Sequence, residues 1–212
     1  TVPYAKRVHG VQGEANAWKE AARRAETTHF FTMDADQRLR PDFSFRIFDW
    51  QDNDQRLHVW RSKNPVNGLV YGHGSIHLFH KDCVLENDNT DVLDFTLASA
   101  HKGFVIQEEQ ASETHFNFNP YQTWRSAFKE CAKLASKTSF YPETDQELGV
   151  TDARMWAWCS LGADAENGYW SILGARMGTI YGLQRQEDTE QLMEQKHYDF
   201  FNQYWKDKNI NV

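Results

Sequence analysis

The amino-acid pattern of this chain changes character near residue 110, and that change constrains the fold more than any other feature. Short apolar runs bounded by turn residues, a pattern typical of strands, fill most of the first half. Longer amphipathic segments follow, among them 121–137, 151–161 and 169–183, with apolar residues at helical spacing. We therefore expect an α/β core over residues 1–118 and a mostly helical part over 119–212, together forming one domain.

Local signals mark where several elements begin. A helix is expected over residues 11–26, because alanines and Trp18 recur at helical spacing opposite a charged face. Asn119 and Pro120 predict the start of the 121–137 helix, with asparagine as its N-cap and proline at its first position. Strands are expected at 28–33, 57–60, 69–71, 76–79 and 103–107, and a last helix at 187–207.

Composition narrows the class of protein. A length of 212 residues suits one large domain, and a net charge of −7 argues against a broadly basic nucleic-acid binder. The three cysteines are widely spaced and odd in number, which matches neither a disulfide framework nor a zinc motif, so we expect a reducing, cytoplasmic location. No run approaches the ~18 apolar residues of a membrane span, so no membrane partner is expected. The oligomeric state stays open.

The most informative motif is FFTMDAD at 30–36, which reads as a short apolar strand ending in two aspartates. In open α/β sheets, ligands bind at the carboxyl ends of strands. Asp34 and Asp36 at such an end would form an oxygen site for Mn²⁺ or Mg²⁺, which in turn would hold a diphosphate. The loop positions at which an EF-hand needs glycine and glutamate are Leu39 and Phe45, which excludes that calcium site. A solvated turn is the alternative.

Two further segments carry candidate substrate-binding groups. At the end of the 57–60 strand, arginine and lysine side chains could contact phosphate or sugar hydroxyls, with charges on a surface loop as the alternative. At 70–76, two glycines around a histidine allow a ligand to approach the backbone closely, with a tight turn as the alternative. The candidate substrate-binding residues are Trp60, Arg61, Lys63, Tyr71, Gly72, His73 and Gly74.

Two single residues complete the candidates. Asp94 lies among apolar residues, where partial burial would raise its pKa and suit it to act as a catalytic base; a helix cap is the alternative. His115 stands where a late strand could return it to the metal site; a structural or exposed histidine is the alternative. No His-Glu-x-x-His or Cys-x-x-Cys spacing supports zinc, and no Gly-x-Ser-x-Gly motif supports a nucleophilic hydrolase.

The order of several motifs carries a family resemblance. PYAKRVHG at 3–10 and FFTMDAD at 30–36 are followed by WRSKNPVN at 60–67, LVYGHG at 69–74 and NPYQTWRSAFKEC at 119–131. Together they resemble a family of phage-encoded GT-A-type glycosyltransferases that is similar to base-J-type DNA glucosyltransferases. The resemblance covers most of the chain, from about residue 3 to residue 183.

This resemblance implies a GT-A-like, Rossmann-type mixed sheet, a nucleotide-sugar donor such as a UDP-sugar, a divalent cation and transfer to a hydroxyl. The acceptor would be a hydroxymethylated base in phage DNA, in the cytoplasm of the host cell. Asp36 would bind the metal, Asp34 would contact the ribose or the metal through water, and His115 would be a third metal ligand. Asp94 would take the acceptor proton in an inverting enzyme, whereas a retaining enzyme would need no such base.

One departure from the GT-A pattern concerns the strand that receives the nucleotide base, which usually precedes the first helix. Residues 2–8 are poorly strand-like, so that strand is expected upstream of this sequence or from a partner. Two alternatives to a glycosyltransferase stay open. One is a catalytically degenerate GT-A-like domain that binds nucleic acid or protein, and the other is a nucleotidyltransferase.

Overall fold

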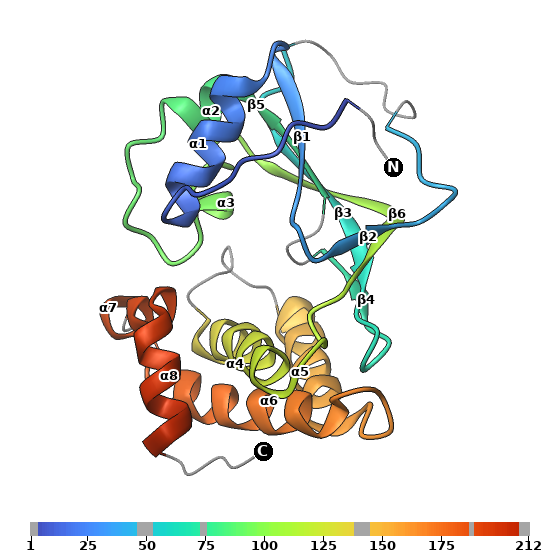
Figure 1. Ribbon diagram of the computed structural model, residues 1–212, viewed down its shortest axis with the longest axis vertical. Helices are drawn as coiled ribbons and strands as arrows, with labels where there is room; N and C mark the ends of the chain where they lie inside the picture. The colour runs from blue at the N-terminus through green and yellow to red at the C-terminus, as the bar shows by residue number, and fades with distance from the viewer. Residues whose placement is uncertain (1–3, 46–52, 73–75, 138–144, 187–188, 208–212) are drawn as a thin grey trace. The chain divides into compact units, whose positions relative to one another are not determined.

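The computed structural model describes residues 4–45, 53–72, 76–137, 145–186 and 189–207. The chain divides into two compact units (Figure 1). The sheet unit comprises Thr1–Lys63 and Val70–Glu113, and the helical unit comprises Asn64–Leu69 and Thr114–Val212. The expected mixed α/β class, with a mixed sheet followed by a helical part, is confirmed. That the whole chain is one domain with a boundary at residue 118 stays a prediction.

The described residues contain a six-stranded sheet with both parallel and antiparallel neighbours. Its order is β1-β5-β3-β6-β2, and β4 pairs with β3 beside this path. Strand β5 is antiparallel to both β1 and β3, and β6 is parallel to β3, so β1, β3 and β6 run in one direction. The strands are β1 His29–Met33, β2 Gln37–Leu39, β3 Leu57–Lys63, β4 Val70–Tyr71, β5 Ile76–His80 and β6 Phe104–Thr114.

The sheet is curved where β1 passes to β2. These two strands stand at opposite ends of the strand order, yet only residues 34–36 separate them. Four Cα steps from Met33 to Gln37 reach roughly 14 Å at full extension, whereas four strand spacings in a flat sheet would need roughly 19 Å. Register shifts between β3 and β6 on both sides of Arg61 interrupt the ladder there, and such bulges bend strands.

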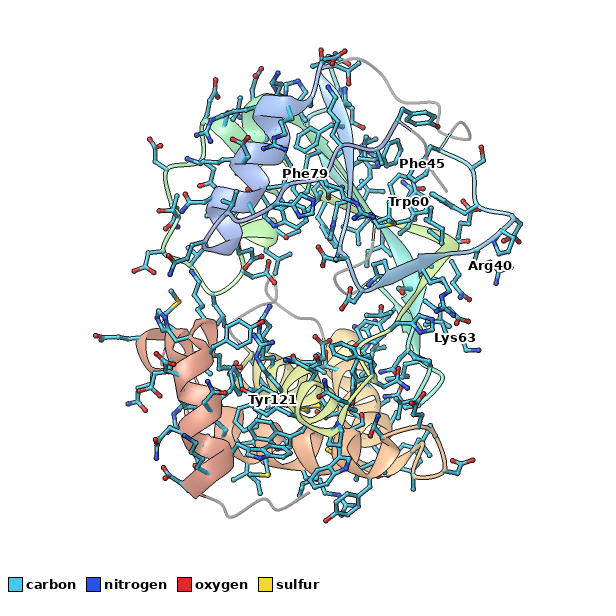
Figure 2. The ribbon with its side chains drawn as sticks, viewed as in Figure 1. Arg40, Phe45, Trp60, Lys63, Phe79 and Tyr121 are labelled. Atoms are coloured by element: carbon cyan, nitrogen blue, oxygen red, sulfur yellow. The ribbon has the colours of Figure 1, made fainter. Side chains whose placement is uncertain are left out.

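Helices cover one face of the sheet. Helix α1, Glu14–Arg24, and helix α2, Lys81–Leu85, lie beside β1 and β5 (Figure 1). Phe79 on β5 packs between Trp18 of α1 and Phe30 of β1, with ring centroids 5.8 Å from each. The short helix α3, Phe95–Ala98, adds Phe95 to the same core. The opposite face buries Trp60 against Phe31, Phe43 and Phe45, and Figure 2 shows Trp60 and Phe45 together.

Three long helices dominate the helical unit: α4 Pro120–Ser136, α5 Asp145–Ser160 and α6 Gly168–Leu183. The predicted start of α4 is confirmed, because the Asn119 side chain accepts a hydrogen bond from the Gln122 amide at 2.9 Å and Pro120 follows the cap. The prediction of one continuous helix over 187–207 is wrong. That segment contains α7 Thr189–Leu192, a 3₁₀ turn η1 Met193–Lys196, an extended residue, His197, and α8 Tyr198–Asp207.

Helices α4 and α6 approach each other through a stripe of glycines. Gly174, Gly178 and Gly182 recur every fourth residue on α6, and a Cβ at each would lie within 2.4 Å of a backbone oxygen of α4. Only hydrogen at these positions permits this spacing, so the stripe sets the distance between the two helix axes. Of the helices in the described ranges, none combines the length and apolar composition that a membrane crossing requires.

The loop between β3 and β4 belongs to the helical unit. Val66 lies in one core cluster with Trp158 of α5 and Ala127 of α4. Gly162 has a φ of +89° and sits so close to Val66 that a Cβ there would lie 2.1 Å from the Val66 oxygen. The side chain of Asn64 accepts hydrogen bonds from the amides of Val66 and Asn67, at 2.9 and 3.3 Å. The Asn-Pro-Val-Asn sequence therefore forms a fixed turn.

Candidate functional site

The two aspartates lie in a tight turn at the carboxyl end of β1. The main-chain N–H of Gln37 donates a hydrogen bond to the main-chain oxygen of Asp34 at 3.1 Å, which closes the turn over residues 34–37. Asp34 is half-buried and Asp36 is exposed. Because β1, β3 and β6 run in one direction, their carboxyl ends meet at the same edge of the sheet. The predicted strand with two aspartates after it is confirmed, and its edge position is the one at which α/β sheets bind ligands.

A buried polar network fixes the far side of this turn. The Gln37 Oε1 accepts from Ser112 Oγ at 2.7 Å and from Ser62 Oγ at 3.1 Å, and the two hydroxyl oxygens are 3.1 Å apart. Both serines are fully buried, and Gln37 is 8% exposed. The Gln37 Nε2 in turn donates to Asp36 Oδ1 at 3.3 Å. The network joins β2, β3 and β6 to one of the candidate metal-binding carboxylates.

The candidate residues of β3 and β4 fall into two groups. Trp60 is 4% exposed and Tyr71 is 6% exposed, so both rings contribute to the core, and substrate binding by them stays a prediction. Arg61 and Lys63 are half-buried at the end of β3, and Lys63 Nζ lies 3.9 Å from a carboxylate oxygen of Glu113 (Figure 2 labels Lys63). Both cations therefore share the sheet edge with the aspartate turn.

Strand β5 begins at the same edge. Ile76, the first residue of β5, pairs with Met33, the last residue of β1, so β5 begins where the aspartate turn begins. Gly72 is half-buried, and a Cβ there would lie 3.3 Å from a side-chain carbon of Val59. His73 and Gly74 lie outside the described residues.

Asp94 caps a helix next to a buried histidine. Its side chain accepts a hydrogen bond from the Leu97 amide at 3.1 Å, at the N-terminus of α3. His77 on β5 is 3% exposed, and this burial lowers its pKa to about 4, while the charge of Asp94 opposes the shift. The Nδ1 of His77 lies 3.5 Å from the hydroxyl of Thr32. Asp94 thus has a structural partner, and its role as a catalytic base stays a prediction.

The opposite edge of the sheet carries an ionic cluster of a different kind. Arg56 binds both oxygens of Asp54, at 2.9 and 2.7 Å, and His58 Nε2 lies 3.2 Å from the same carboxylate. Hydrogen bonds from Arg56 are the main cause that holds the pKa of Asp54 well below its usual range. A carboxylate held by an arginine and a histidine at the start of β3 stabilises the fold and is poorly suited to act as a base.

The structure leaves the proposed third metal ligand as a prediction. His115 belongs to the helical unit, one residue after β6, whereas the two aspartates belong to the sheet unit. Within the ranges that the structure describes, no three His, Cys, Asp or Glu residues form a group able to hold a metal ion. At this turn the described residues therefore contribute two carboxylates to the candidate metal site, those of Asp34 and Asp36. Magnesium sites that carry phosphates use such pairs, with substrate oxygens and water as the other ligands.

Sequence reasoning missed the network behind the turn. Gln37, Ser62 and Ser112 were assigned no role, although each is a polar residue in a strand. Ser62 and Ser112 stand at inward positions, where a buried hydroxyl needs a hydrogen-bond partner. An isolated serine within a strand was the available signal, but the register that brings the two together became visible only in the sheet.

The edge therefore carries two carboxylates and two neighbouring cations, which suits the binding of a metal–phosphate group. Compared with family models, with curated proteins and with solved structures, the chain has no match in any of the three.

Proposed function

We propose that this chain is a metal-dependent glycosyltransferase with a GT-A-like sheet unit. It would move a sugar from a nucleotide-sugar donor, such as a UDP-sugar, to a hydroxyl acceptor. The observation that carries the proposal is the turn of Asp34 and Asp36 at the edge where β1, β3 and β6 end. The resemblance of the motif order to phage-encoded GT-A-type enzymes supports it.

The residues present suit a diphosphate-bound cation. Asp36 is exposed on the turn and Asp34 is half-buried beside it, and carboxylate oxygens are the ligand type that Mn²⁺ or Mg²⁺ would take here. When bound, the cation neutralises negative charge on the departing diphosphate. Arg61 and Lys63 at the end of β3 would add positive charge for phosphate or donate to sugar hydroxyls. His115 is retained as the proposed third ligand.

The acceptor side rests on Asp94. In an inverting reaction its carboxylate would take the proton of the acceptor hydroxyl, and it would have to leave the Leu97 amide or share one oxygen with it. A retaining reaction would leave Asp94 as a helix cap alone. A hydroxymethylated base in phage DNA is the proposed acceptor, on the family resemblance. The net charge of −7 means that DNA would need a local basic surface.

The test is a panel of sugar nucleotides with Mn²⁺, in which donor hydrolysis and transfer to hydroxymethylated and plain DNA are measured. Sugar transfer supports the proposal. Metal binding with no turnover would instead support a degenerate binding domain, and transfer of a nucleoside monophosphate would support a nucleotidyltransferase. Absence of hydrolysis and transfer with every donor overturns the enzyme proposal.

Two matched aspartate variants make the test specific. Asp36→Asn should abolish metal-dependent turnover and leave the unfolding midpoint close to that of the parent, because the residue is exposed. Asp88→Asn makes the same chemical change on an exposed loop, where the carboxylate lies 3.8 Å from Lys19, and should leave turnover unchanged. Full activity of Asp36→Asn would remove that residue from the metal site.

A further inference from the structure

The side-chain amide of Gln37 has one orientation that suits its contacts with Ser62, Ser112 and Asp36. Its oxygen faces the hydroxyls of Ser62 and Ser112, and its nitrogen faces Asp36. The reversed amide would place its oxygen 3.3 Å from an Asp36 carboxylate oxygen, which brings two acceptors together without a proton between them. The contact with Asp36 therefore selects the orientation, and the two serines hold it.

The anchor of this amide is rigid for a physical reason. Ser62 and Ser112 are fully buried on the adjacent strands β3 and β6, which pair at these two residues. A buried hydroxyl that loses its hydrogen-bond partner destabilises the fold, so the serines resist any movement of the Gln37 side chain. The main-chain N–H of Gln37 also donates a hydrogen bond to the main-chain oxygen of Asp34, which fixes the backbone of Gln37. Gln37 thus touches both residues of the aspartate turn.

We propose that Gln37 is a positioning residue for the candidate metal site. The buried Ser62–Ser112 pair fixes its side-chain amide, which orients the Asp36 carboxylate toward a divalent cation. The hydrogen bond from the neutral amide N–H fixes the orientation of the Asp36 carboxylate and leaves its negative charge in place. Hydrogen-bonded partners of metal ligands typically change metal affinity 10–100-fold when they are removed. This inference rests on the proposed function, because it needs a metal bound at Asp36.

The test measures the dissociation constant of Mn²⁺ alone, by electron paramagnetic resonance, in the full chain. Gln37→Met keeps the length of the side chain and removes both of its polar atoms, so the dissociation constant should rise about 10–100-fold. Ser112→Ala removes the shorter of the two anchoring bonds and should raise it less. In the double variant Gln37→Met/Ser112→Ala, the loss of Mn²⁺ affinity should equal that of Gln37→Met alone. Both serine hydrogen bonds act on the metal site through the same Gln37 amide.

A matched glutamine separates positioning from folding. Gln107 lies on β6 and binds Nδ1 of His58 at 3.0 Å, at a place remote from the turn in the strand register. Gln107→Met should lower the unfolding midpoint and leave the Mn²⁺ dissociation constant unchanged. Turnover of Gln37→Met should recover as the Mn²⁺ concentration is raised, which a kcat defect from misfolding would not do.

The outcomes distinguish this inference from the proposed function. If the parent binds Mn²⁺ and transfers sugar while Gln37→Met and Ser112→Ala bind Mn²⁺ as the parent does, positioning by Gln37 is refuted and the function stands. If the parent binds Mn²⁺ and Gln37→Met weakens that binding without any sugar transfer, the positioning role is supported and the transferase is refuted. A parent that binds no Mn²⁺ overturns the inference.

Discussion

The glycine stripe on α6 predicts a result opposite to that expected from helix propensity. Alanine is favoured over glycine inside a helix by about 1 kcal/mol, so Gly178→Ala would stabilise an isolated helix. In this protein the added Cβ would lie 2.2 Å from the Phe128 oxygen and 2.8 Å from its Cα. Both are main-chain atoms of α4, and no side-chain rotation relieves the contact.

The size of the effect follows from that distance. Ordinary contact begins near 3.4 Å, so α6 must withdraw from α4 by roughly 1 Å at Gly178. A gap of this size forfeits up to about half of the dispersion energy of each contact it opens, and overpacking costs about 1–3 kcal/mol or more. With a cost of about 3 kcal/mol and a propensity gain of about 1 kcal/mol, the net loss is about 2 kcal/mol, or about 4–8 °C in Tm.

Urea unfolding followed by circular dichroism, together with thermal melts, measures this loss. Ile180→Ala is the control on the same helix: its side chain is 58% exposed, and the change should stay within about 0.5 kcal/mol. A Gly178→Ala protein as stable as the parent, or more stable, would refute the idea that close approach of α4 and α6 limits this position.

Three further predictions concern other parts of the chain. Asn119→Ala should cost about 1 kcal/mol through loss of the α4 cap, whereas Asn119→Ser should retain most of the stability; equal losses in urea melts would argue against capping. The pKa of His77 is about 4 when folded and 6.5 ordinarily, so the unfolded chain binds the extra proton between these values. The free energy of unfolding should therefore fall as pH drops from 6.5 to 4, by up to about 3 kcal/mol, and His77→Phe should flatten that part of the profile. A hydrogen bond from Cys131 is the main cause that lowers the pKa of Cys159 to about 6, whereas burial raises the pKa of Cys83. Iodoacetamide at neutral pH should label Cys159 several-fold faster than Cys83, as read by peptide mass spectrometry, and equal rates would contradict the shift.

The fold could be predicted from sequence where local signals and burial agree. Helix α4 carries its own cap and a single apolar face, and its boundaries were placed within one residue. Strand β6 was expected to end at residue 107 but continues to Thr114, because pairing with β3 and β2 holds the polar residues that follow. The segment after residue 189 has helical composition throughout. An extended His197 nevertheless interrupts it, and propensity does not encode that tertiary preference.

The candidate site also has a part that the sequence predicts and a part that it does not. A strand that ends in two aspartates is visible in the sequence, since both the apolar run and the carboxylates are local. The partners of Asp36 are not local, because Ser62 and Ser112 reach Gln37 across separations of 25 and 75 residues. Trp60 illustrates the converse, since this motif residue is 4% exposed and packs in the core, while substrate binding by it stays a prediction. Motif position alone does not distinguish a residue that binds from one that packs.

The loop at 64–69 determines how this chain can be divided by protein engineering. A fragment that starts at Thr114 would contain α4, α5 and α6 but would lack Val66, which fills the core between α4 and α5 and lies against Gly162. Removing a buried valine side chain together with its loop exposes apolar surface around Trp158, so the isolated fragment should tend to aggregate. A soluble helical fragment would need residues 64–69 supplied as a grafted or co-expressed segment. The natural unit for cloning and for domain exchange is therefore the sheet unit together with the helical unit, not one of them alone.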